Sequence, residues 1–477
     1  MERNNKNKEG KAALILIIAL LLVIGISLLP LSRWSGGKIK DFNLLGDIMN
    51  DSVTAAIYDN EAEVESTMVV DPELAKVQES ESQDTLDGRV SEITGMMAES
   101  DSDYQNFADV PVKPSRVGEV VVIEDYTSDN RGLSSLRSAI ASGRHARIAV
   151  VGDSYIEGDI FTQDLREKLQ NAYGGNGVGY VNMHSDFPGF RKSIKQGGNG
   201  WKTFTALKKA KNKYMALSEQ YSTPTGTALS TYNGTVSFPH TGSWSISRFL
   251  FISPDDAVVS CRTGKGEWVE HEIKGDSIVQ CISVNGMTEN FEVKTSATSL
   301  IGLGVWLDGT DGVSVDCMSS RGFSGITLSR INTLLCRQMS QSIPYNLIIL
   351  EFGINAMSPQ QKDYHIYSNR MVDVINHVRS CYPGADILLM GIGDRGEKRG
   401  GAVHSMSVAP AMIAAQRDAA RRAHCLFWDT REAMGGEDAI VEWSRQGLAN
   451  KDYIHLTHKG GARLADELFN ALQQCLK

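Results

Sequence analysis

The sequence is poor in cysteine and has no excess of positive charge. It has 7 cysteines in 477 residues, the first at position 261, and none of them form a C-x-x-C pair. That pattern excludes a zinc ribbon, a dithiol redox motif and a dense disulfide framework. The formal net charge is −9. A chain without an overall basic field is not expected to grip phosphate backbones, so nucleic acid is excluded as a partner.

Charged residues are absent from residues 12–32. These 21 residues would rise about 31 Å as a helix, enough to cross the hydrocarbon core of a bilayer. Basic residues are more frequent before the run than acidic ones, which favours an internal N-terminus. We therefore expect a cytoplasmic tail (1–11), a single-pass membrane anchor (12–32) and a catalytic domain on the extracytoplasmic side. A cleaved signal peptide is the alternative.

The next segment is strongly acidic. Residues 41–110 contain 18 Asp or Glu, against Lys76 and Arg89 alone. Such a stretch, with few aromatic residues and many serines, buries too little apolar surface to offset the entropy of the chain. We predict that residues 33–114 form a largely disordered linker.

Beyond the linker, short apolar runs alternate with stretches of helical periodicity. This alternation is typical of a parallel sheet covered by helices on both faces, and the runs predict a sheet of four or five strands. The expected strands are 146–151, 347–352, 386–391 and 425–428, and the expected helices are 160–172, 364–382, 412–423 and 459–476.

A different pattern interrupts this region at residues 201–311. Its short β-rich runs are separated by Gly, Pro, Asn or Asp, which predicts a β-sandwich inserted between two parts of the α/β domain, 115–200 and 312–477. Cys261 and Cys281 fall on strands expected to be neighbours, so a disulfide between them stays open. The expected strands are 235–238, 244–252, 257–262, 278–284, 291–295 and 300–307.

The chemistry of the sequence lies in the α/β parts. Ser154 follows the first expected strand and precedes a helix, where its hydroxyl can project over the edge of the sheet. A serine hydroxyl needs a general base to become nucleophilic. Asp452 stands three residues before His455, a spacing at which the carboxylate can accept the Nδ1 proton and leave Nε2 facing a serine. These residues are the candidate catalytic triad.

Four short motifs in order resemble the blocks of the SGNH (GDSL) hydrolase superfamily: Gly152-Asp153-Ser154, Gly325-Ile326-Thr327, Gly353-Ile354-Asn355, and Asp452 with His455. The resemblance implies a flavodoxin-like three-layer α/β/α fold, with Ser154 as nucleophile, His455 as base and Asp452 as its orienter. It also implies an oxyanion hole made of the Ser154 N–H, the Gly325 N–H and the Asn355 amide. Gly322 competes with Gly325 for the second position.

The longer string around Ser154 and the inserted β-rich region are similar to bacterial peptidoglycan O-acetylesterases, whose insert resembles a carbohydrate-binding module. Tyr155 stands where many relatives carry a histidine. The resemblance implies a serine esterase that removes O-acetyl or other short acyl groups from a cell-envelope or other polysaccharide, through an acyl-enzyme and without cofactor or metal. The alternatives are a polysaccharide O-acetyltransferase that uses the same residues, a glycan-binding protein without catalysis, and, less favoured, a lipase.

Three further sets of residues have a functional and a structural interpretation. His455 and His458 could hold a metal with Asp452, although the motif favours His458 as a surface or helix-start residue. A group of lysines could attract an acidic glycan or simply face solvent, and four tryptophans could stack on sugars or pack in a core. In both sets the second interpretation is favoured. They are Lys202, Lys208, Lys209, Lys211 and Lys213, and Trp201, Trp244, Trp268 and Trp306.

Overall fold

The computed structural model describes residues 119–186, 188–206 and 211–476. The predicted membrane anchor at 12–32 and the acidic linker at 33–114 lie outside these residues. Within the described ranges, no helix combines the length and the apolar composition that crossing a membrane requires.

The central sheet has six strands in the order β1-β17-β14-β13-β2-β12. All pairs are parallel except the one between β1 and β17. Counting only the parallel strands along the chain, their spatial order is 2-1-3-4-5, the flavodoxin-like arrangement that the resemblance implied. The strands are β1 (Glu124–Asp125), β2 (Ala146–Gly152), β12 (Val313–Ser319), β13 (Leu347–Glu351), β14 (Asp386–Met390) and β17 (Leu426–Trp428).

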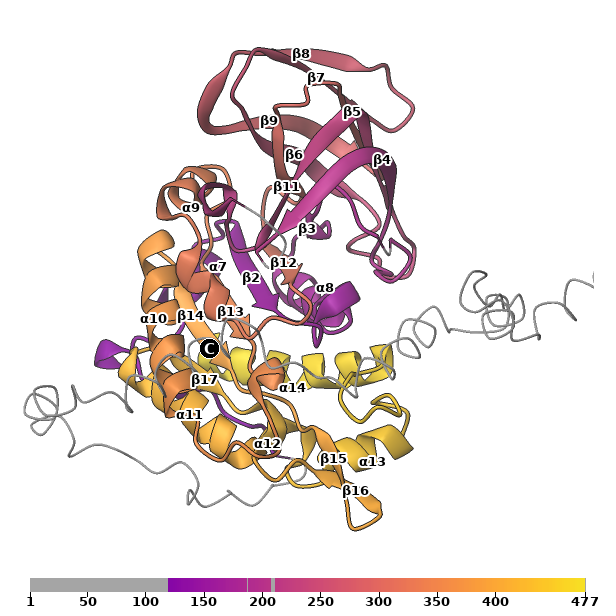
Figure 1. Cartoon of the computed structure of the whole chain (residues 1–477). Helices are drawn as coiled ribbons and strands as arrows, with labels where there is room; N and C mark the ends of the chain where they lie inside the picture. Colours follow the sequence, from indigo (N-terminus) through magenta and orange to yellow (C-terminus); the bar gives the residue numbers. More distant parts are fainter. Residues whose placement is uncertain (1–118, 187, 207–210, 477) are drawn as a thin grey trace, which may run out of the picture. The chain divides into compact units, whose positions relative to one another are not determined.

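Two groups of helices flank this sheet (Figure 1). One group contains α8 (Thr162–Tyr173), which packs on α14 (His458–Leu476). The other contains α10 (His365–Cys381), which packs on α9 (Thr333–Met339) and α11 (Ala409–Arg422). Every residue of β2 and β13 is buried, which explains why these strands read as continuous apolar runs in the sequence. The remaining helices are α7 (Ser134–Ala141), α12 (Thr430–Met434) and α13 (Ala439–Arg445).

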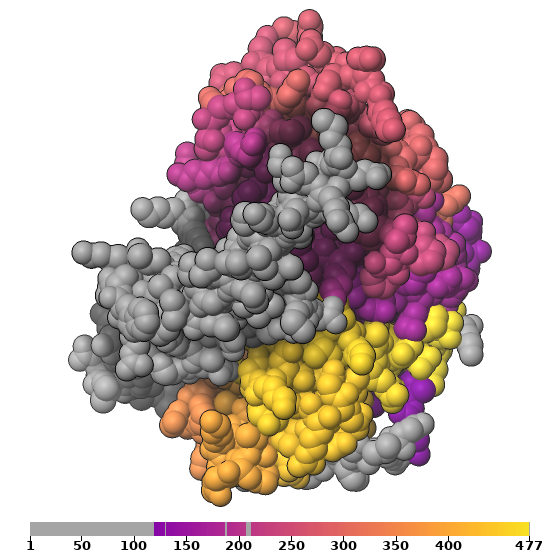
Figure 2. Space-filling view, turned by 90° about the vertical axis from the view of Figure 1, so that its right-hand side faces the viewer, coloured from indigo at the N-terminus to yellow at the C-terminus, as the bar shows by residue number. Residues whose placement is uncertain are grey.

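The inserted region forms a β module with its own nine-stranded sheet. The order β8-β7-β10-β5-β11-β6-β9 contains one weak junction, because β5 and β11 share the single register pair Ser222–Gly302. Side chains from both halves, such as Phe291 and Phe249, pack into one core. Figure 2 shows the surface of the module, which lies at the top of the view and is hollowed near its centre. The strands on this path are β5 (Gln220–Gly234), β6 (Trp244–Ser253), β7 (Ala257–Thr263), β8 (Val269–Ile273), β9 (Asp276–Thr288), β10 (Asn290–Thr295) and β11 (Ile301–Asp308).

The module differs from the predicted one at its start. It includes β3 (Gly179–Val181), paired with β11, and β4 (Ile194–Thr205), paired with β5, so it begins before residue 201. The strand predicted at 235–238 was wrong, because these residues form a turn in which Thr241 N–H donates to the Phe238 carbonyl. Cys261 and Cys281 are free thiols on β7 and β9, which are not neighbours in the sheet.

Candidate active site

Ser154 lies in the turn that follows β2, at the carboxyl edge of the sheet and beside β13. This is the point at which the parallel strand order reverses, where open α/β sheets bind their ligands. The Tyr155 N–H donates to Asp153 Oδ1 at 2.9 Å, which closes the turn. Helix α8 begins only at Thr162, after a 3₁₀ turn at Glu157–Asp159, so Ser154 is farther from the helix start than the sequence suggested.

Asp452 and His455 lie in the loop between α13 and α14. The Asp452 Oδ1 atom accepts the N–H groups of Ile454 and His455 at 2.9 and 3.1 Å, so the carboxylate folds the loop around itself. Tyr453 takes a positive φ of 59° within this tight loop. Ile454 and Leu456 are buried and anchor it to the core.

The three side chains meet as the sequence predicted. Ser154 Oγ is 3.0 Å from His455 Nε2, and His455 Nδ1 is 2.8 Å from Asp452 Oδ2. Burial alone would raise the pKa of the Asp452 carboxyl, but the hydrogen bonds from His455 and the loop backbone hold it below its usual value. Asp452 is therefore the ionised partner of the imidazole, and the order of contacts is the one that activates a serine hydroxyl.

Two glycines at the start of α14 bring this loop to Ser154. A Cβ atom on Gly460 would lie 1.8 Å from the Leu448 carbonyl oxygen, and one on Gly461 would lie 1.9 Å from the Ile160 carbonyl oxygen. Ile160 belongs to the segment between Ser154 and α8. Only glycine permits so close a backbone approach, so Gly461 fixes the distance between the segment after Ser154 and the helix that follows the His455 loop.

The two other candidate residues of the oxyanion hole also lie at this edge. Asn355 Nδ2 donates to the Phe323 carbonyl at 2.9 Å, which joins the loop after β13 to the turn that contains Gly325. Gly325 has a φ of +88°, and a Cβ atom there would lie 2.7 Å from the Phe352 ring. Gly322 also has a positive φ, but a Cβ atom there would meet no atom within 4 Å. The close packing against Phe352 thus requires a glycine at position 325, whereas nothing near position 322 does.

Two buried carboxyl groups behind the site escaped the sequence analysis. Asp153, fully buried, accepts a hydrogen bond from Asn355 Nδ2 at 3.0 Å. Burial raises its pKa to about 7, although Tyr155, His455, Arg395 and Asn355 oppose that rise. Burial also raises the pKa of Glu351, at the end of β13, well above its usual value, and the charge of Asp153 raises it further. Asp153 stands inside the Gly-Asp-Ser motif, which was the only available signal.

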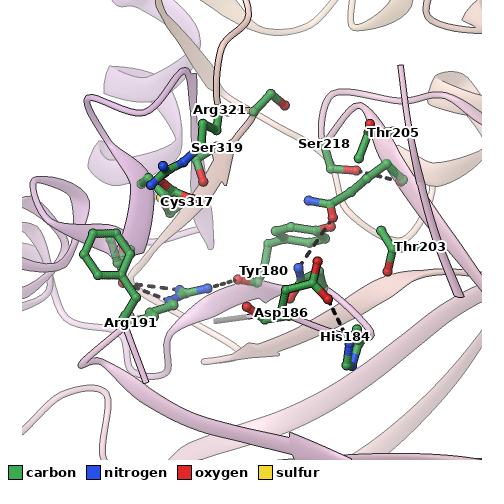
Figure 3. Close-up of a pocket in the computed structure, with 18 of the residues that line it drawn as sticks. Tyr180, His184, Asp186, Arg191, Thr203, Thr205, Ser218, Cys317, Ser319 and Arg321 are labelled. Atoms are coloured by element: carbon green, nitrogen blue, oxygen red, sulfur yellow. Dashed lines mark hydrogen bonds and ion pairs between the residues drawn. The ribbon is translucent and has the colours of Figure 1, made fainter. Parts of the chain in front are cut away.

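A cavity of about 360 Å³ opens between the α/β sheet and the β module, and the 3₁₀ turn that follows Ser154 forms part of its wall. Glu157 and Phe323, which line it, are close in the chain to Ser154 and Gly325. Figure 3 shows Thr203, Thr205 and Ser218 of the module facing Arg321 and Ser319 across the cavity. Most of the residues that line the cavity have polar side chains, with amide, hydroxyl and charged groups from both parts of the chain, although apolar atoms also form much of the wall. Such a wall suits a ligand rich in hydroxyl groups.

Of the residues with two interpretations, Lys208 and Lys209 lie outside the described residues, and the others have mostly structural roles. His458 is the first residue of α14 and its Nδ1 lies 3.1 Å from Gln163 Nε2. No group of three His, Cys, Asp or Glu side chains in the described part of the chain could hold a metal ion. Trp201, Trp244 and Trp306 are buried, and Trp268 lies under Arg262 and Lys294. Lys202 and Lys213 lie over the rings of Phe204 and Tyr214.

Comparison with known proteins identifies the α/β part. Residues 274–463 match the GDSL-like lipase/acylhydrolase family, a range that contains Gly325, Asn355, Asp452 and His455 but not Ser154. A solved peptidoglycan O-acetylesterase is 22% identical with a TM-score of 0.62, over 74% of this chain and 99% of that one. A family two carbohydrate esterase from Cellvibrio japonicus is 11% identical with a TM-score of 0.25, over 60% and 98%. No curated protein matches.

The two informative comparisons agree with the topology. At 22% identity the O-acetylesterase shows the fold, and the family match covers three of the four motifs that the sequence contains. The strand order 2-1-3-4-5 and the position of Ser154 at the reversal of that order are independent of both. The resemblance seen in the sequence is thereby supported: residues 274–463 match the GDSL-like lipase/acylhydrolase family, and the α/β part has the fold of the solved O-acetylesterase.

Proposed function

We propose that the protein is a serine esterase that removes O-acetyl or other short acyl groups from a polysaccharide of the cell envelope, with peptidoglycan as the leading candidate. The observation that carries this proposal is the 3.0 Å contact between Ser154 Oγ and His455 Nε2, with Asp452 on the far side of the imidazole. This arrangement is the general-base device that makes a serine nucleophilic. The cavity between the α/β sheet and the β module is lined mainly by residues with polar side chains, which fits a sugar better than a long acyl chain.

The reaction proceeds in two steps of acyl transfer. His455 Nε2 takes the Ser154 proton while the oxygen attacks the ester carbonyl, and the imidazolium then gives that proton to the departing sugar hydroxyl. Water, activated by the same imidazole, attacks the acyl-enzyme and releases the carboxylic acid. Asp452 stays ionised and stabilises the imidazolium in both steps.

The negative oxygen formed in each step needs hydrogen-bond donors. We assign this role to the N–H groups of Ser154 and Gly325 and to the Asn355 amide. In the structure, Asn355 Nδ2 donates to Asp153 and to the neutral Phe323 carbonyl. A full negative charge is the stronger acceptor, so the oxyanion competes with the Phe323 carbonyl for one of these hydrogens.

The test is acetate release by the full-length chain in detergent from O-acetylated peptidoglycan, O-acetylated xylan and p-nitrophenyl acetate. We expect release from at least one glycan, and a loss of at least about 1,000-fold in kcat in Ser154→Ala. Release that is unchanged in Ser154→Ala would remove the nucleophile. Oligosaccharide acceptors are included because transfer that exceeds free acetate would identify an O-acetyltransferase instead.

We further propose that residues 12–32 hold the protein in the cell membrane as a single-pass anchor, with residues 33–114 as a tether and the catalytic domain on the extracytoplasmic side. The uncharged run and the acidic composition of the tether support this proposal. The full chain should fractionate with membranes and stay there in high salt. Its catalytic domain should be cleaved by protease added to spheroplasts, and protection in intact spheroplasts would contradict the orientation.

A further inference from the structure

Glu219 of the β module is bonded to the turn that contains Gly325. We propose that Glu219 is a positioning residue for this turn, so that the β module holds in place one of the backbone donors on which the esterase site depends. This inference rests on the proposed function and deepens it, because it gives the module a part in turnover as well as in binding.

The contact is short and buried. Thr327 Oγ1 donates to Glu219 Oε1 at 2.5 Å, and the two residues are 5% and 1% exposed. Thr327 belongs to η7 (Ile326–Arg330), whose N-terminal residue follows Gly325 directly. A hydrogen bond between two such buried groups holds both firmly, because breaking it costs the interaction without giving either group full access to solvent.

The backbone of Glu219 is also held in an unusual conformation. Its φ is 50°, a left-handed value that costs a non-glycine residue on the order of 1–3 kcal/mol. Its N–H donates to the Ala216 carbonyl at 2.9 Å, and its carbonyl accepts the Ala206 N–H at 3.0 Å. These bonds fix the residue from two sides. Backbone strain that the surrounding structure maintains in this way clusters at active sites and ligand-binding segments.

The turn that contains Gly325 has contacts with both the α/β part and the β module. On the α/β side, Gly325 packs on Phe352, and the Tyr367 hydroxyl donates to the Ser324 carbonyl at 3.2 Å. On the module side are the Glu219–Thr327 contact and the Asn332 N–H, which donates to the Met215 carbonyl at 2.8 Å. Because Gly325 lies between these supports, losing the module side would let its N–H move relative to Ser154.

The same segment of the module also reaches the cavity. Ser218, Glu219 and Gln220 line it, together with Arg321 and Phe323 from the approach to Gly325. Ser218 and Gln220, which would contact a bound glycan, are therefore the sequence neighbours of Glu219, which supports the turn that contains Gly325. Binding and turnover share one structural element.

The experiment breaks the contact from each side in the full-length chain, with Thr327→Val and Glu219→Met, and measures hydrolysis of p-nitrophenyl acetate. This ester is too small to depend on the glycan contacts of the module. We expect kcat to fall about 10-fold while KM changes less than about 2-fold, because the loss concerns the alignment of an oxyanion donor. Thr327→Ser and Glu219→Gln, which keep a donor and an acceptor, should retain most of the activity.

Two further measurements separate positioning from general damage. A boronic acid places an oxygen where the oxyanion forms, so its affinity should fall in Thr327→Val and Glu219→Met in parallel with kcat. The double variant should be no slower than the slower single variant, since both remove the same contact. Glu270→Gln, at an exposed position of strand β8, is the matched control and should leave kcat unchanged.

The outcomes distinguish the two proposals. If the wild-type chain hydrolyses no ester, both the proposed function and this inference fail. If the wild type is active, Ser154→Ala is inactive and Thr327→Val keeps its kcat and its boronate affinity, the esterase stands and the positioning role is wrong. A fall in thermal stability alone, without a change in either quantity, contradicts the inference in the same way.

Discussion

Asp153 shows how a single buried side chain can control the site without touching substrate. Its Oδ1 accepts the Tyr155 N–H and its Oδ2 accepts the Asn355 Nδ2–H, so one carboxylate orients both the turn of the proposed nucleophile and a proposed oxyanion donor. An ionised carboxylate is the form best suited to accept both bonds. Burial opposes that form and raises the pKa of Asp153 to about 7.

We therefore predict that Asp153→Asn lowers kcat for p-nitrophenyl acetate by about 10-fold or more with a smaller change in KM. The substituted amide offers one oxygen and one NH₂ group, so its NH₂ must face either the Tyr155 N–H or the Asn355 amide, both of which are donors. Asp255→Asn, at an exposed position in the β module, is the control. Equal kcat values in the wild type and Asp153→Asn would contradict the orienting role.

The same carboxyl group predicts a pH dependence of stability. Its pKa rises from 3.8 to about 7 on folding, so the folded state binds the proton more tightly than the unfolded state. The stabilisation that this proton provides is complete below about pH 4 and is lost as the pH rises to about 7. Glu351 acts in the same direction, since its pKa is also raised.

In urea unfolding at pH 4.5 and pH 7.5, the wild type should therefore lose more free energy of unfolding between the two pH values than Asp153→Asn does. The neutral amide does not titrate, and it also relieves the repulsion that raises the pKa of Glu351. If the two proteins show the same difference between the two pH values, Asp153 does not titrate in this range.

At the residue scale, the sequence predicted those residues that belong to short motifs and whose side chains have a specific chemical role. Ser154, Asp452 and His455 belong to that class, and the structure brings them together. The supporting contacts join residues that are far apart in the chain. Asn355 and Asp153 are separated by 202 positions, and Thr327 and Glu219 by 108. A carboxyl group that will be buried has the same appearance in a sequence as an exposed one, so Glu351 and Glu219 could not be found.

At the scale of elements, the position of α14 determines whether the triad forms. Gly461 rests on the Ile160 carbonyl, and the loop that carries His455 ends where this helix begins. The helix presents an apolar face through Leu464, Leu468 and Leu472, all fully buried, which sets its rotation. The glycine sets how closely its first turn approaches the segment after Ser154.

Gly461→Ala should therefore separate His455 from Ser154. The added methyl group would lie 1.9 Å from a backbone oxygen, which must move because it is not a flexible side chain. We expect kcat to fall about 10- to 100-fold, since a displacement of about 1 Å in a catalytic pair has effects of this size. Gly384→Ala is the control, because a Cβ atom there meets nothing within 4 Å. Equal activity in the two variants would show that α14 adapts without moving the loop.

The sequence predicted the strands that consist mostly of apolar residues but not those that contain many polar residues. The strands 146–151, 347–352, 386–391 and 425–428 all appear as β2, β13, β14 and β17. The strand β12 was missed because Asp316 and two serines interrupt its apolar residues, and β4 and β5 because they are rich in Gly, Thr and Ser. Their pairing is decided by neighbours elsewhere in the chain rather than by their own pattern.

At the scale of the whole described molecule, a buried group of charges joins the β module to the central sheet. Arg147 of β2 lies 2.8 Å from Asp308 at the end of β11 and 3.4 Å from Asp316 of β12. Asp308 also accepts a bond from Arg248 of β6, and Asp316 accepts one from the Trp306 ring N–H. The attraction of the two carboxylates raises the pKa of Arg147 and keeps it charged despite its burial.

Arg147→Met is therefore expected to destabilise the chain strongly. It leaves Asp308 and Asp316 buried with much of their compensating charge removed, which typically costs roughly 3–5 kcal/mol and should lower Tm by roughly 5–10 °C. Lys274→Met removes one partner of the exposed pair with Asp256 and should change stability by less than about 0.5 kcal/mol. If thermal unfolding shows equal shifts in the two variants, the buried charges do not hold the module to the sheet. If protease cleaves the module below Tm in Arg147→Met but not in Lys274→Met, the contacts of Arg147 hold the module to the sheet. The Glu219 contact, which also joins the module to the α/β part, then depends on them.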